Sequence, residues 1–250
     1  MTNKISIVTA TYNATATIHD CLECIKKQTV AVEHILIDGM SEDSTLTIIN
    51  EHSDSLAHII SEPDTGIYDA MNKGLGLTSG EIVGILNADD FYPAGDTLTK
   101  VLRAFDDPSI DACYGDLLYV DGSNSDKIIR NWRSGSFSPE KFYWGWMPPH
   151  PTFFVRRSVY EKYGLFNTNL GSAADYEIML RFLVKHKIKA AYIPEVLVKM
   201  RTGGISNASV KNRLAANRMD RKAWEENELK PYPWTLWMKP ARKIGQWLWK

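Results

Sequence analysis

The chain has 250 residues, of which 44% are hydrophobic and 24% charged, and its formal net charge is -1 at pH 7. This is the composition of an ordinary globular protein, long enough to bury a core as one large domain with or without an appendage. The near-zero charge argues against a general nucleic-acid-binding protein. No apolar run of the sequence is long enough to cross a bilayer.

Cysteine usage predicts a protein of the reducing cytoplasm, because the chain has only Cys21, Cys24 and Cys113 and its first residues lack the apolar core of a signal peptide. Cys21 and Cys24 form a C-x-x-C pattern, which is found in redox and zinc sites. They fall inside an amphipathic helix pattern, and one more distant cysteine cannot complete a four-ligand zinc site by itself. We therefore interpret both as ordinary helix cysteines.

The N-terminal part of the chain alternates strand and helix patterns. Residues 5–9 and 34–38 are strand-like runs, each followed by a polar loop and a helix, and a third short strand at 58–61 precedes the loop and helix of residues 62–74. This order predicts a doubly wound, mostly parallel α/β sheet with helices on both faces. The sequence has neither a G-x-G-x-x-G fingerprint after the first strand nor a Gly-Lys-Ser/Thr loop, so a bound nucleotide is held by another device.

The strongest functional signal is a buried strand pattern that ends abruptly at Asn87, Asp89 and Asp90. Open α/β sheets bind their ligands at this carboxyl edge, and Asp38 and Asp64 are expected at the same edge. Adjacent carboxylates repel each other, and a divalent cation that carries a phosphorylated substrate is the simplest way to keep both ionised. The alternative is that the two adjacent aspartates only form the turn after the strand.

The segment 142–152 combines aromatic residues, three prolines and one histidine. Aromatic faces are suited to stacking on sugar rings, and the prolines restrict the shape of the loop. We therefore expect acceptor recognition by Trp144, Trp146 and His150. Contact with the leaving diphosphate, a place in the metal shell and a purely structural role are the alternatives for the histidine.

Two further polar positions are candidates for the site. Asp175 lies at the start of the helix pattern 171–182, where an acidic residue also serves as an N-terminal cap or charge. The glycine-bearing loop 201–206 begins with Arg201, whose charge is suited to closing the loop over a diphosphate. A flexible connector is the alternative reading of that loop.

Four motifs in chain order resemble those of a family 2 glycosyltransferase with the GT-A fold. They are VTATYN at 8–13, DGMSEDST at 38–45, DTGIYDAMNKG at 64–74 and NADD at 87–90. Each motif is modest by itself, but four in the order of the family are specific. The resemblance covers residues 5–206, and it implies an inverting glycosyltransferase of the bacterial polysaccharide-assembly type.

The resemblance implies a role for each matching position. These positions are Thr9, Ala10 and Tyr12 for the nucleoside, Asp38 for the base, Asp64 and Lys73 for the nucleotide, Asp89 and Asp90 for the metal, and Asp175 for the catalytic base. Asn87 departs from the family, because many relatives carry the first aspartate of an Asp-x-Asp motif there. An amide oxygen can ligate a hard cation or bond a ribose hydroxyl but adds no charge. We therefore expect Asp89 to be the main metal ligand and Asn87 to contact the sugar or the ribose, whereas Lys73 is as well explained by a solvated helix position.

The composition changes towards the C-terminus. We expect a GT-A domain at 1–208, with a nucleotide-binding half (1–110) and an acceptor-binding half (111–208), and a helical extension at 209–250. That extension holds five of the eight tryptophans, namely Trp224, Trp234, Trp237, Trp247 and Trp249. After Pro240 its apolar residues share one helical face and its cations lie elsewhere, which is typical of an interfacial membrane helix. The alternative is that the tryptophans pack on the domain or on a second subunit.

The patterns and the resemblance together predict a transferase that moves a sugar from a nucleotide-diphosphate sugar to a hydroxyl of a glycan or polyprenyl-diphosphate-linked acceptor. The resemblance implies inversion and favours UDP as the donor nucleotide, with GDP as the alternative. Mg²⁺ or Mn²⁺ on Asp89, shared with Asp90, would neutralise the leaving diphosphate, and Asp175 would accept the proton of the acceptor. Glycoside hydrolysis is disfavoured, because two adjacent aspartates cannot flank a glycosidic bond. A noncatalytic, membrane-associated sugar-nucleotide-binding or assembly protein is the alternative of a different class. The expected location is the cytoplasm, at the inner face of the cell membrane.

Overall fold

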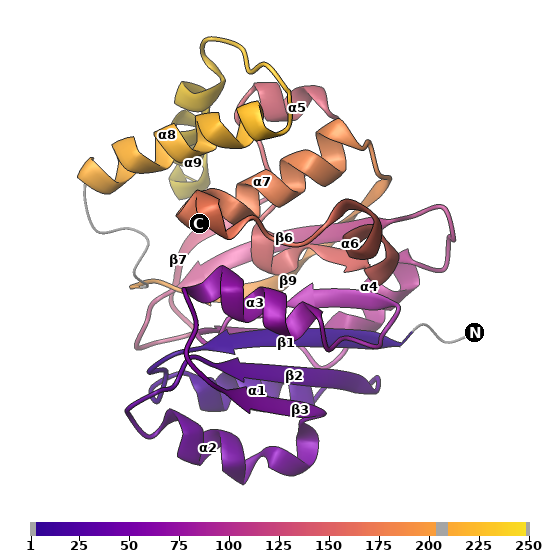
Figure 1. Cartoon of the computed structure of the whole chain (residues 1–250), viewed down its shortest axis with the longest axis vertical. Coiled ribbons are helices and arrows are strands. Elements are labelled where there is room, and N and C mark those ends of the chain that lie inside the picture. The colour runs from indigo at the N-terminus through magenta and orange to yellow at the C-terminus, as the bar shows by residue number, and fades with distance from the viewer. Residues whose placement is uncertain (1–3, 204–209, 249–250) are drawn as a thin grey trace.

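The computed structural model describes residues 4–203 and 210–248, and the side chains of residues 4–203 and 217–242. Over this part of the chain a nine-stranded sheet runs through the molecule, and helices cover both of its faces (Figure 1). In chain order the strands are β1 (Ile5–Thr11), β2 (Val32–Asp38), β3 (His58–Ser61), β4 (Ile82–Ile85), β5 (Asp90–Phe91), β6 (Ala112–Val120), β7 (Ile128–Trp132), β8 (Phe154–Arg156) and β9 (Ala190–Arg201).

Most of the helices are short, and several are extended by single 3-10 or π turns. The α-helices are α1 (Ile18–Lys26), α2 (Thr45–Glu51), α3 (Ile67–Leu75), α4 (Thr97–Ala104), α5 (Glu140–Tyr143), α6 (Arg157–Tyr163), α7 (Ala174–Leu180), α8 (Val210–Glu226) and α9 (Thr235–Leu248). The 3-10 turn η3 (Thr168–Ala173) leads directly into α7, and the π turn η4 (Arg181–Lys185) continues it. Cys21 and Cys24 lie on α1 as free thiols, in agreement with the helix interpretation.

The N-terminal half of the sheet is parallel, with β1 between β2 and β4 and with β3 on the outer side of β2. Every residue of β1 is buried, because Ile7 faces the core cluster on the α1 and α4 side and Val8 faces the cluster on the α3 side. This half confirms the α/β fold class that the alternation of strands and helices predicted. β1 continues past the expected residue 9, because Thr11 still pairs with Asp38 at the end of β2.

The C-terminal half of the sheet is mixed. β8 is antiparallel to both β4 and β6, β6 is parallel to β9, and β9 is antiparallel to the two-residue strand β5. Asp90 of β5 pairs with Met200 of β9, so the next residue of β9, Arg201, lies at the acidic end of β4. The mixed half therefore places a cation from the end of the domain beside the acidic motif.

The helix α8 packs against α7. Trp224 is fully buried, and its indole Nε1 donates a hydrogen bond of 2.9 Å to the hydroxyl of Tyr176. One turn later, Nδ2 of Asn227 donates to Oε1 of Glu177 at 3.0 Å. Part of the expected extension is thus joined to the helix that carries Asp175.

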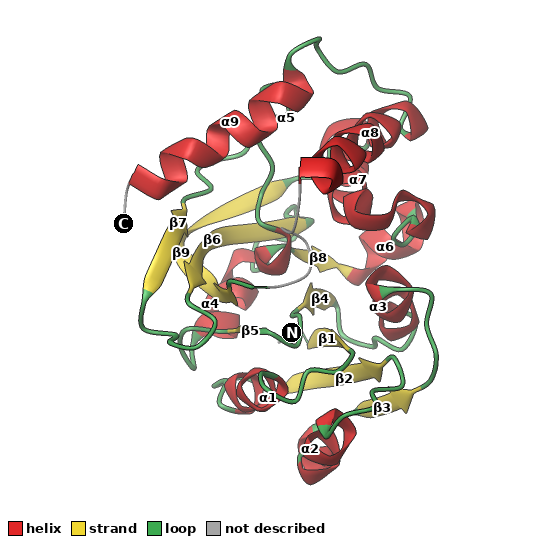
Figure 2. Ribbon diagram, turned by 90° about the vertical axis from the view of Figure 1, so that its left-hand side faces the viewer, coloured by secondary structure: helices red, strands yellow, loops and turns green. Residues whose placement is uncertain are grey.

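The last helix, α9, lies beside β7 (Figure 2). It begins at Thr235, whose hydroxyl donates to the carbonyl of Tyr143 at 2.6 Å. Pro240 therefore lies inside the helix. Of the apolar face predicted at Ala241, Ile244, Trp247 and Leu248, only Ala241 lies within the described side chains, and it is exposed. Among the described residues, no helix combines the length and apolar character that a membrane span requires.

Replacing Trp224 with alanine is expected to lower the free energy of unfolding by about 3–5 kcal/mol, because a fully buried aromatic ring and its hydrogen bond are removed. Urea denaturation followed by circular dichroism measures this loss. Trp237→Ala is the matched control, since Trp237 is 69% exposed and its removal should change the free energy by less than about 0.5 kcal/mol. A similar small change for both variants would contradict the assignment of α8 to the core.

Candidate active site

An exposed aromatic ring and a carboxylate lie together where β1 and β2 end. Tyr12 follows β1 and is 59% exposed. A Cβ atom added to Gly39, just after β2, would meet Oδ2 of Asp64 at 2.5 Å and the ring of Tyr12 at 3.5 Å. The glycine therefore allows Asp64 and Tyr12 to approach the same point, and Oδ1 of Asp64 also accepts a hydrogen bond of 2.8 Å from the backbone of Gly66. A flat, exposed ring beside hydrogen-bonding groups is suited to holding a nucleoside.

Three residues predicted to line the nucleoside pocket turn their side chains inwards. Thr9 is fully buried and its hydroxyl lies 3.0 Å from Nε2 of His34, and Ala10 is also buried. Asp38 is fully buried, and its carboxylate accepts hydrogen bonds from the hydroxyls of Ser41 and Ser61. These side chains hold the strand ends and the loop after β2 in place, so Tyr12 is the member of the set that faces solvent.

Lys73 also has a local partner. Its Nζ lies 2.8 Å from a carboxylate oxygen of Glu62 and donates to the carbonyl of Pro63 at 2.8 Å. The ion pair raises the pKa of Lys73. In this arrangement Lys73 anchors the loop that carries Asp64.

The two adjacent aspartates of the acidic motif have different surroundings. Asp90 is fully buried and accepts a hydrogen bond of 3.0 Å from Nδ2 of Asn87. Burial raises its pKa well above the ordinary value, and the charge of Asp89 raises it further. Asp89 is partly exposed; burial raises the pKa of its carboxyl too, and the Arg201 guanidinium opposes that shift. Asp89 is thus the carboxylate of the pair that can reach a ligand from solvent.

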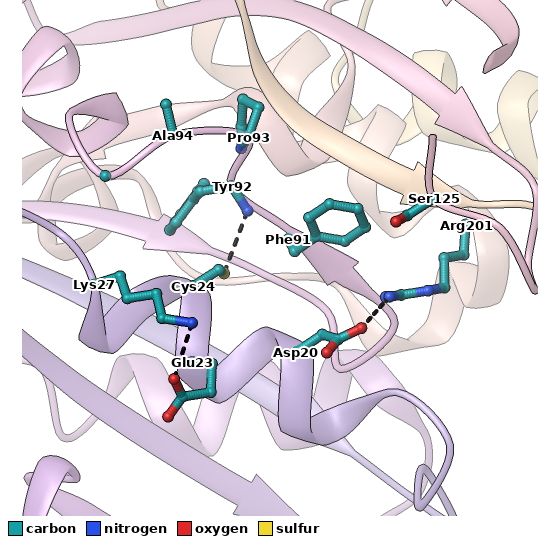
Figure 3. A pocket seen from close by; sticks show the side chains of 11 residues that line it. Asp20, Glu23, Cys24, Lys27, Phe91, Tyr92, Pro93, Ala94, Ser125 and Arg201 are labelled. Carbon is teal, nitrogen blue, oxygen red and sulfur yellow. Dashed lines mark hydrogen bonds and ion pairs between the residues drawn. The ribbon is translucent and has the colours of Figure 1, made fainter. Parts of the chain in front are cut away.

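Arg201 lies between the acidic motif and α1 (Figure 3). Its Nη1 donates to the backbone carbonyl of Asp89 at 3.1 Å, its Nη2 forms an ion pair with Asp20, and its guanidinium lies 4.7 Å from the ring centre of Phe91. Asp20, Phe91 and Arg201 line a cavity of about 330 Å³ between α1 and the loop after β5. The predicted diphosphate contact is therefore adjacent to the predicted metal ligand.

The residues of the motif fit a divalent cation that keeps part of its shell for substrate. Oδ1 of Asn87 and Oδ1 of Asp90 are buried and have no hydrogen-bond partner, and Asp89 adds a partly exposed carboxylate. Within the described residues no group of three or more His, Cys, Asp or Glu side chains forms a complete metal cage. Mg²⁺ is commonly held by one or two carboxylates and substrate phosphates, which is the donor set available here.

Asp175 is surrounded by a tyrosine and a histidine. It lies in the first turn of α7 and is partly exposed. The hydroxyl of Tyr68 interacts with the Asp175 carboxyl, and burial together with this carboxyl raises the pKa of Tyr68. Burial lowers the pKa of His150, and Asp175 opposes that shift. Both rings contact Phe166, at centroid distances of 5.3 Å for Tyr68 and 5.6 Å for His150. The predicted base Asp175 and the predicted acceptor histidine His150 therefore lie in one cluster with Tyr68 and Phe166.

The two tryptophans predicted for the acceptor differ in position. Trp144 is 47% exposed. Trp146 is buried, its Nε1 donates to the carbonyl of Ser134 at 2.8 Å, and its ring packs on Phe142. We assign Trp146 to the core and leave it out of the proposed acceptor contacts.

Two tyrosines of the site were not among the predicted residues. Tyr68 lies within the motif 64–74, but its contact with Asp175 joins segments far apart in the chain and has no sequence signal. Tyr119 on β6 is raised in pKa by burial and, to a smaller extent, by both Asp90 and Asp175.

The chain is similar in sequence to known glycosyltransferases. The profile described as "Glycosyl transferase family 2" matches residues 6–164. A PGL/p-HBAD biosynthesis glycosyltransferase of Mycobacterium bovis (strain BCG / Pasteur 1173P2) is 32% identical over 215 residues, which are 82% of this chain and 80% of the relative.

Solved structures share the fold at lower identity. S. aureus TarS 1-349 in complex with UDP-GlcNAc matches with a TM-score of 0.71 and 18% identity, covering 97% of this chain and 73% of that one. The mannosyltransferase PcManGT from Pyrobaculum calidifontis, in complex with GDP-Man and Mn²⁺, matches with a TM-score of 0.67 and 19% identity, covering 98% and 75%. The family profile and the close relative span most of the chain, and these structures have the same architecture. This chain therefore belongs to glycosyl transferase family 2 and is a glycosyltransferase with the GT-A fold.

Proposed function

We propose that this glycosyltransferase takes its sugar from a nucleotide-diphosphate donor, with UDP as the first candidate, and transfers it with inversion to a hydroxyl of a glycan or lipid-linked acceptor in surface polysaccharide synthesis. The observation that carries the proposal is the position of the loop 64–66 and the first turn of α3. Asp64 lies beside the exposed Tyr12, and Tyr68, four residues later, interacts with Asp175. A donor bound along this segment would have its nucleoside at one end and Asp175 near its sugar.

Asp89 and Arg201 would bind the diphosphate end of the donor. A Mg²⁺ or Mn²⁺ ion on Asp89, with Asn87 and Asp90 behind it, would supply the positive charge that makes the nucleoside diphosphate a better leaving group. The guanidinium of Arg201 adds a fixed cation beside Asp89. The Mn²⁺ bound to PcManGT supports this proposal.

Asp175 would act as the general base. Its carboxylate would accept the proton of the acceptor hydroxyl while that oxygen attacks the anomeric carbon from the face opposite the leaving diphosphate. The bond from sugar to diphosphate breaks as the new glycosidic bond forms, and the products are a glycoside and a nucleoside diphosphate. Because the pKa of His150 is lowered, its imidazole would be neutral. A neutral imidazole beside Asp175 would orient the acceptor without adding positive charge that competes with the donor-site cations.

We retain the division into a nucleotide-binding half (1–110), an acceptor-binding half (111–208) and a helical extension (209–250) as a proposal. A membrane contact of the extension is supported by Trp237, which is 69% exposed, and by the exposed cation of Arg242. Such a contact would hold the enzyme at the inner face of the membrane, where a lipid-linked acceptor is available. Deleting residues 231–250 would not test the membrane contact alone, because the deletion also removes Thr235 and Leu236, which are buried in the fold.

A thermal-shift series with nucleotides and divalent cations tests the donor assignment. UDP or a UDP-sugar is expected to raise the melting temperature only when Mg²⁺ or Mn²⁺ is present, because a ligand bound by the native state alone stabilises it. At a concentration of 100 times Kd the gain is about 2.7 kcal/mol. GDP and GDP-mannose serve as the matched comparison for the base. Absence of a shift with every nucleotide, with and without metal, would contradict the proposed donor class.

A further inference from the structure

A second groove lies on the acceptor half of the molecule, away from the residues assigned to the donor. It has a volume of about 670 Å³ and runs between α5, the end of the π turn η4 and the connection from α8 to α9. Its lining includes Tyr143, Tyr232 and Asn227. Asn227 also donates to Glu177 on α7, two residues beyond Asp175, so the groove is built on the same helix as the proposed base.

Exposed aromatic rings continue from this groove onto the surface. Tyr143 contacts Tyr232 at a ring-centre distance of 5.1 Å, Tyr232 contacts Trp234 at 5.2 Å, and Trp234 contacts Trp144 at 5.8 Å. Trp144, Tyr232 and Trp234 are between 44% and 47% exposed. Rings that pack against one another keep a fixed orientation, while their open faces and edges remain available to a ligand.

The charges along the groove balance one another. Its lining contains Glu140 and Glu228 as well as Lys185 and Lys187, and Lys185 lies 3.9 Å from Glu228. A phosphorylated ligand or an anionic bilayer would meet as much negative as positive charge there. A neutral polyhydroxyl chain, in contrast, can hydrogen-bond to both kinds of group and stack on the rings.

From these observations we infer that the groove and its aromatic surface form a second carbohydrate site, which holds a neutral glycan segment of the acceptor or product. This inference rests on the proposed function, which supplies the expectation that the acceptor is a glycan. It adds a site outside the donor and base residues, and such a site would keep a growing chain bound while its end is extended. The gain would come from effective concentration, since the second binding event becomes intramolecular.

The test is isothermal titration calorimetry of the full chain with hexasaccharides of glucose, N-acetylglucosamine and mannose. At least one hexasaccharide is expected to bind, and Tyr232→Ala and Trp234→Ala are each expected to weaken binding by about tenfold, because both remove an aromatic anchor. Trp237→Ala is the matched control: Trp237 lies on α9, three residues after Trp234, and is more exposed. Among the described residues it belongs neither to the groove lining nor to the ring contacts that join Tyr232, Trp234 and Trp144. Thermal denaturation of each variant checks that the fold is retained.

Each outcome bears on the inference separately from the donor assignment. Hexasaccharide binding that survives in Asp175→Asn and is weakened about tenfold in Trp234→Ala, with the nucleotide thermal shift intact in Trp234→Ala, supports a second site. No binding of any of the hexasaccharides overturns it, even when the nucleotide shift is normal. Equal weakening by Trp237→Ala also overturns it. Binding of anionic vesicles that depends on Trp234, without hexasaccharide binding, would assign the surface to a membrane instead.

Discussion

Replacing Asp175 with asparagine is expected to reduce the rate of sugar transfer by about 100- to 10,000-fold, the usual contribution of a positioned general base. Asparagine has nearly the same shape as aspartate, but its amide cannot take up the acceptor proton. Initial rates of nucleoside diphosphate release, measured with and without acceptor, give the size of the loss.

The specificity of this effect is checked in two ways. Asp126→Asn is the matched control, since Asp126 is an exposed aspartate in the turn between β6 and β7 and should leave the rate unchanged. Donor binding by Asp175→Asn should match that of the unchanged protein, because Asp175 acts on the acceptor. Transfer at the original rate in Asp175→Asn would remove this residue from the mechanism. Donor binding without turnover in the unchanged protein, on every lipid-linked acceptor, would favour the noncatalytic alternative.

Replacing Asp89 with alanine is expected to abolish the metal-dependent part of donor binding. Asp89 is the partly exposed carboxylate of the acidic motif, whereas Asp90 is fully buried beneath it. Without Asp89 the cation keeps only the uncharged oxygen of Asn87 and an inaccessible carboxyl, and hard divalent ions need anionic oxygen ligands. Calorimetric titration with UDP, in the presence of Mn²⁺ and in the presence of a chelator, separates the metal-dependent affinity from the rest.

Asp96→Ala provides the control for this variant, because Asp96 is a more exposed aspartate close in the chain whose carboxylate pairs with Lys100 on the surface. The control is expected to keep the difference between the titrations with and without Mn²⁺. If Asp89→Ala binds UDP as the unchanged protein does under both conditions, Asp89 is not the metal ligand. Loss of binding under both conditions alike would instead indicate that the loop between β4 and β5 has changed shape.

The fold of the N-terminal half was predictable because its signals are local. A parallel strand buried on both faces reads as a mostly apolar run, and β4 (IVGI) and the ILI segment of β2 do so, while β1 (ISIVTAT) is apolar between its serine and threonines. The C-terminal half was less predictable. β5 has two residues and β8 has three, so neither is long enough to show an alternation of apolar and polar residues in the sequence. Both form because they pair with longer neighbouring strands.

The positions of the site motifs were predictable, but the directions of their side chains were not. Asp38, Asp64 and Asp89 do follow strand ends or loops at the carboxyl edge. Asp38 nevertheless turns inwards to Ser41 and Ser61, and Trp146 turns inwards to Ser134. Both orientations depend on hydrogen-bond partners that only folding brings near.

By itself, the sequence determined the class of the sheet, its family and the chain positions from which the acidic groups come, because strand periodicity and short motifs are local properties of the chain. Only the tertiary structure decided that Tyr68 meets Asp175, that Arg201 meets Asp89, and that α8 closes the core through a buried tryptophan. These contacts join residues separated by about 50 to more than 100 positions, and the pairing of distant segments depends on packing and burial summed over the whole chain.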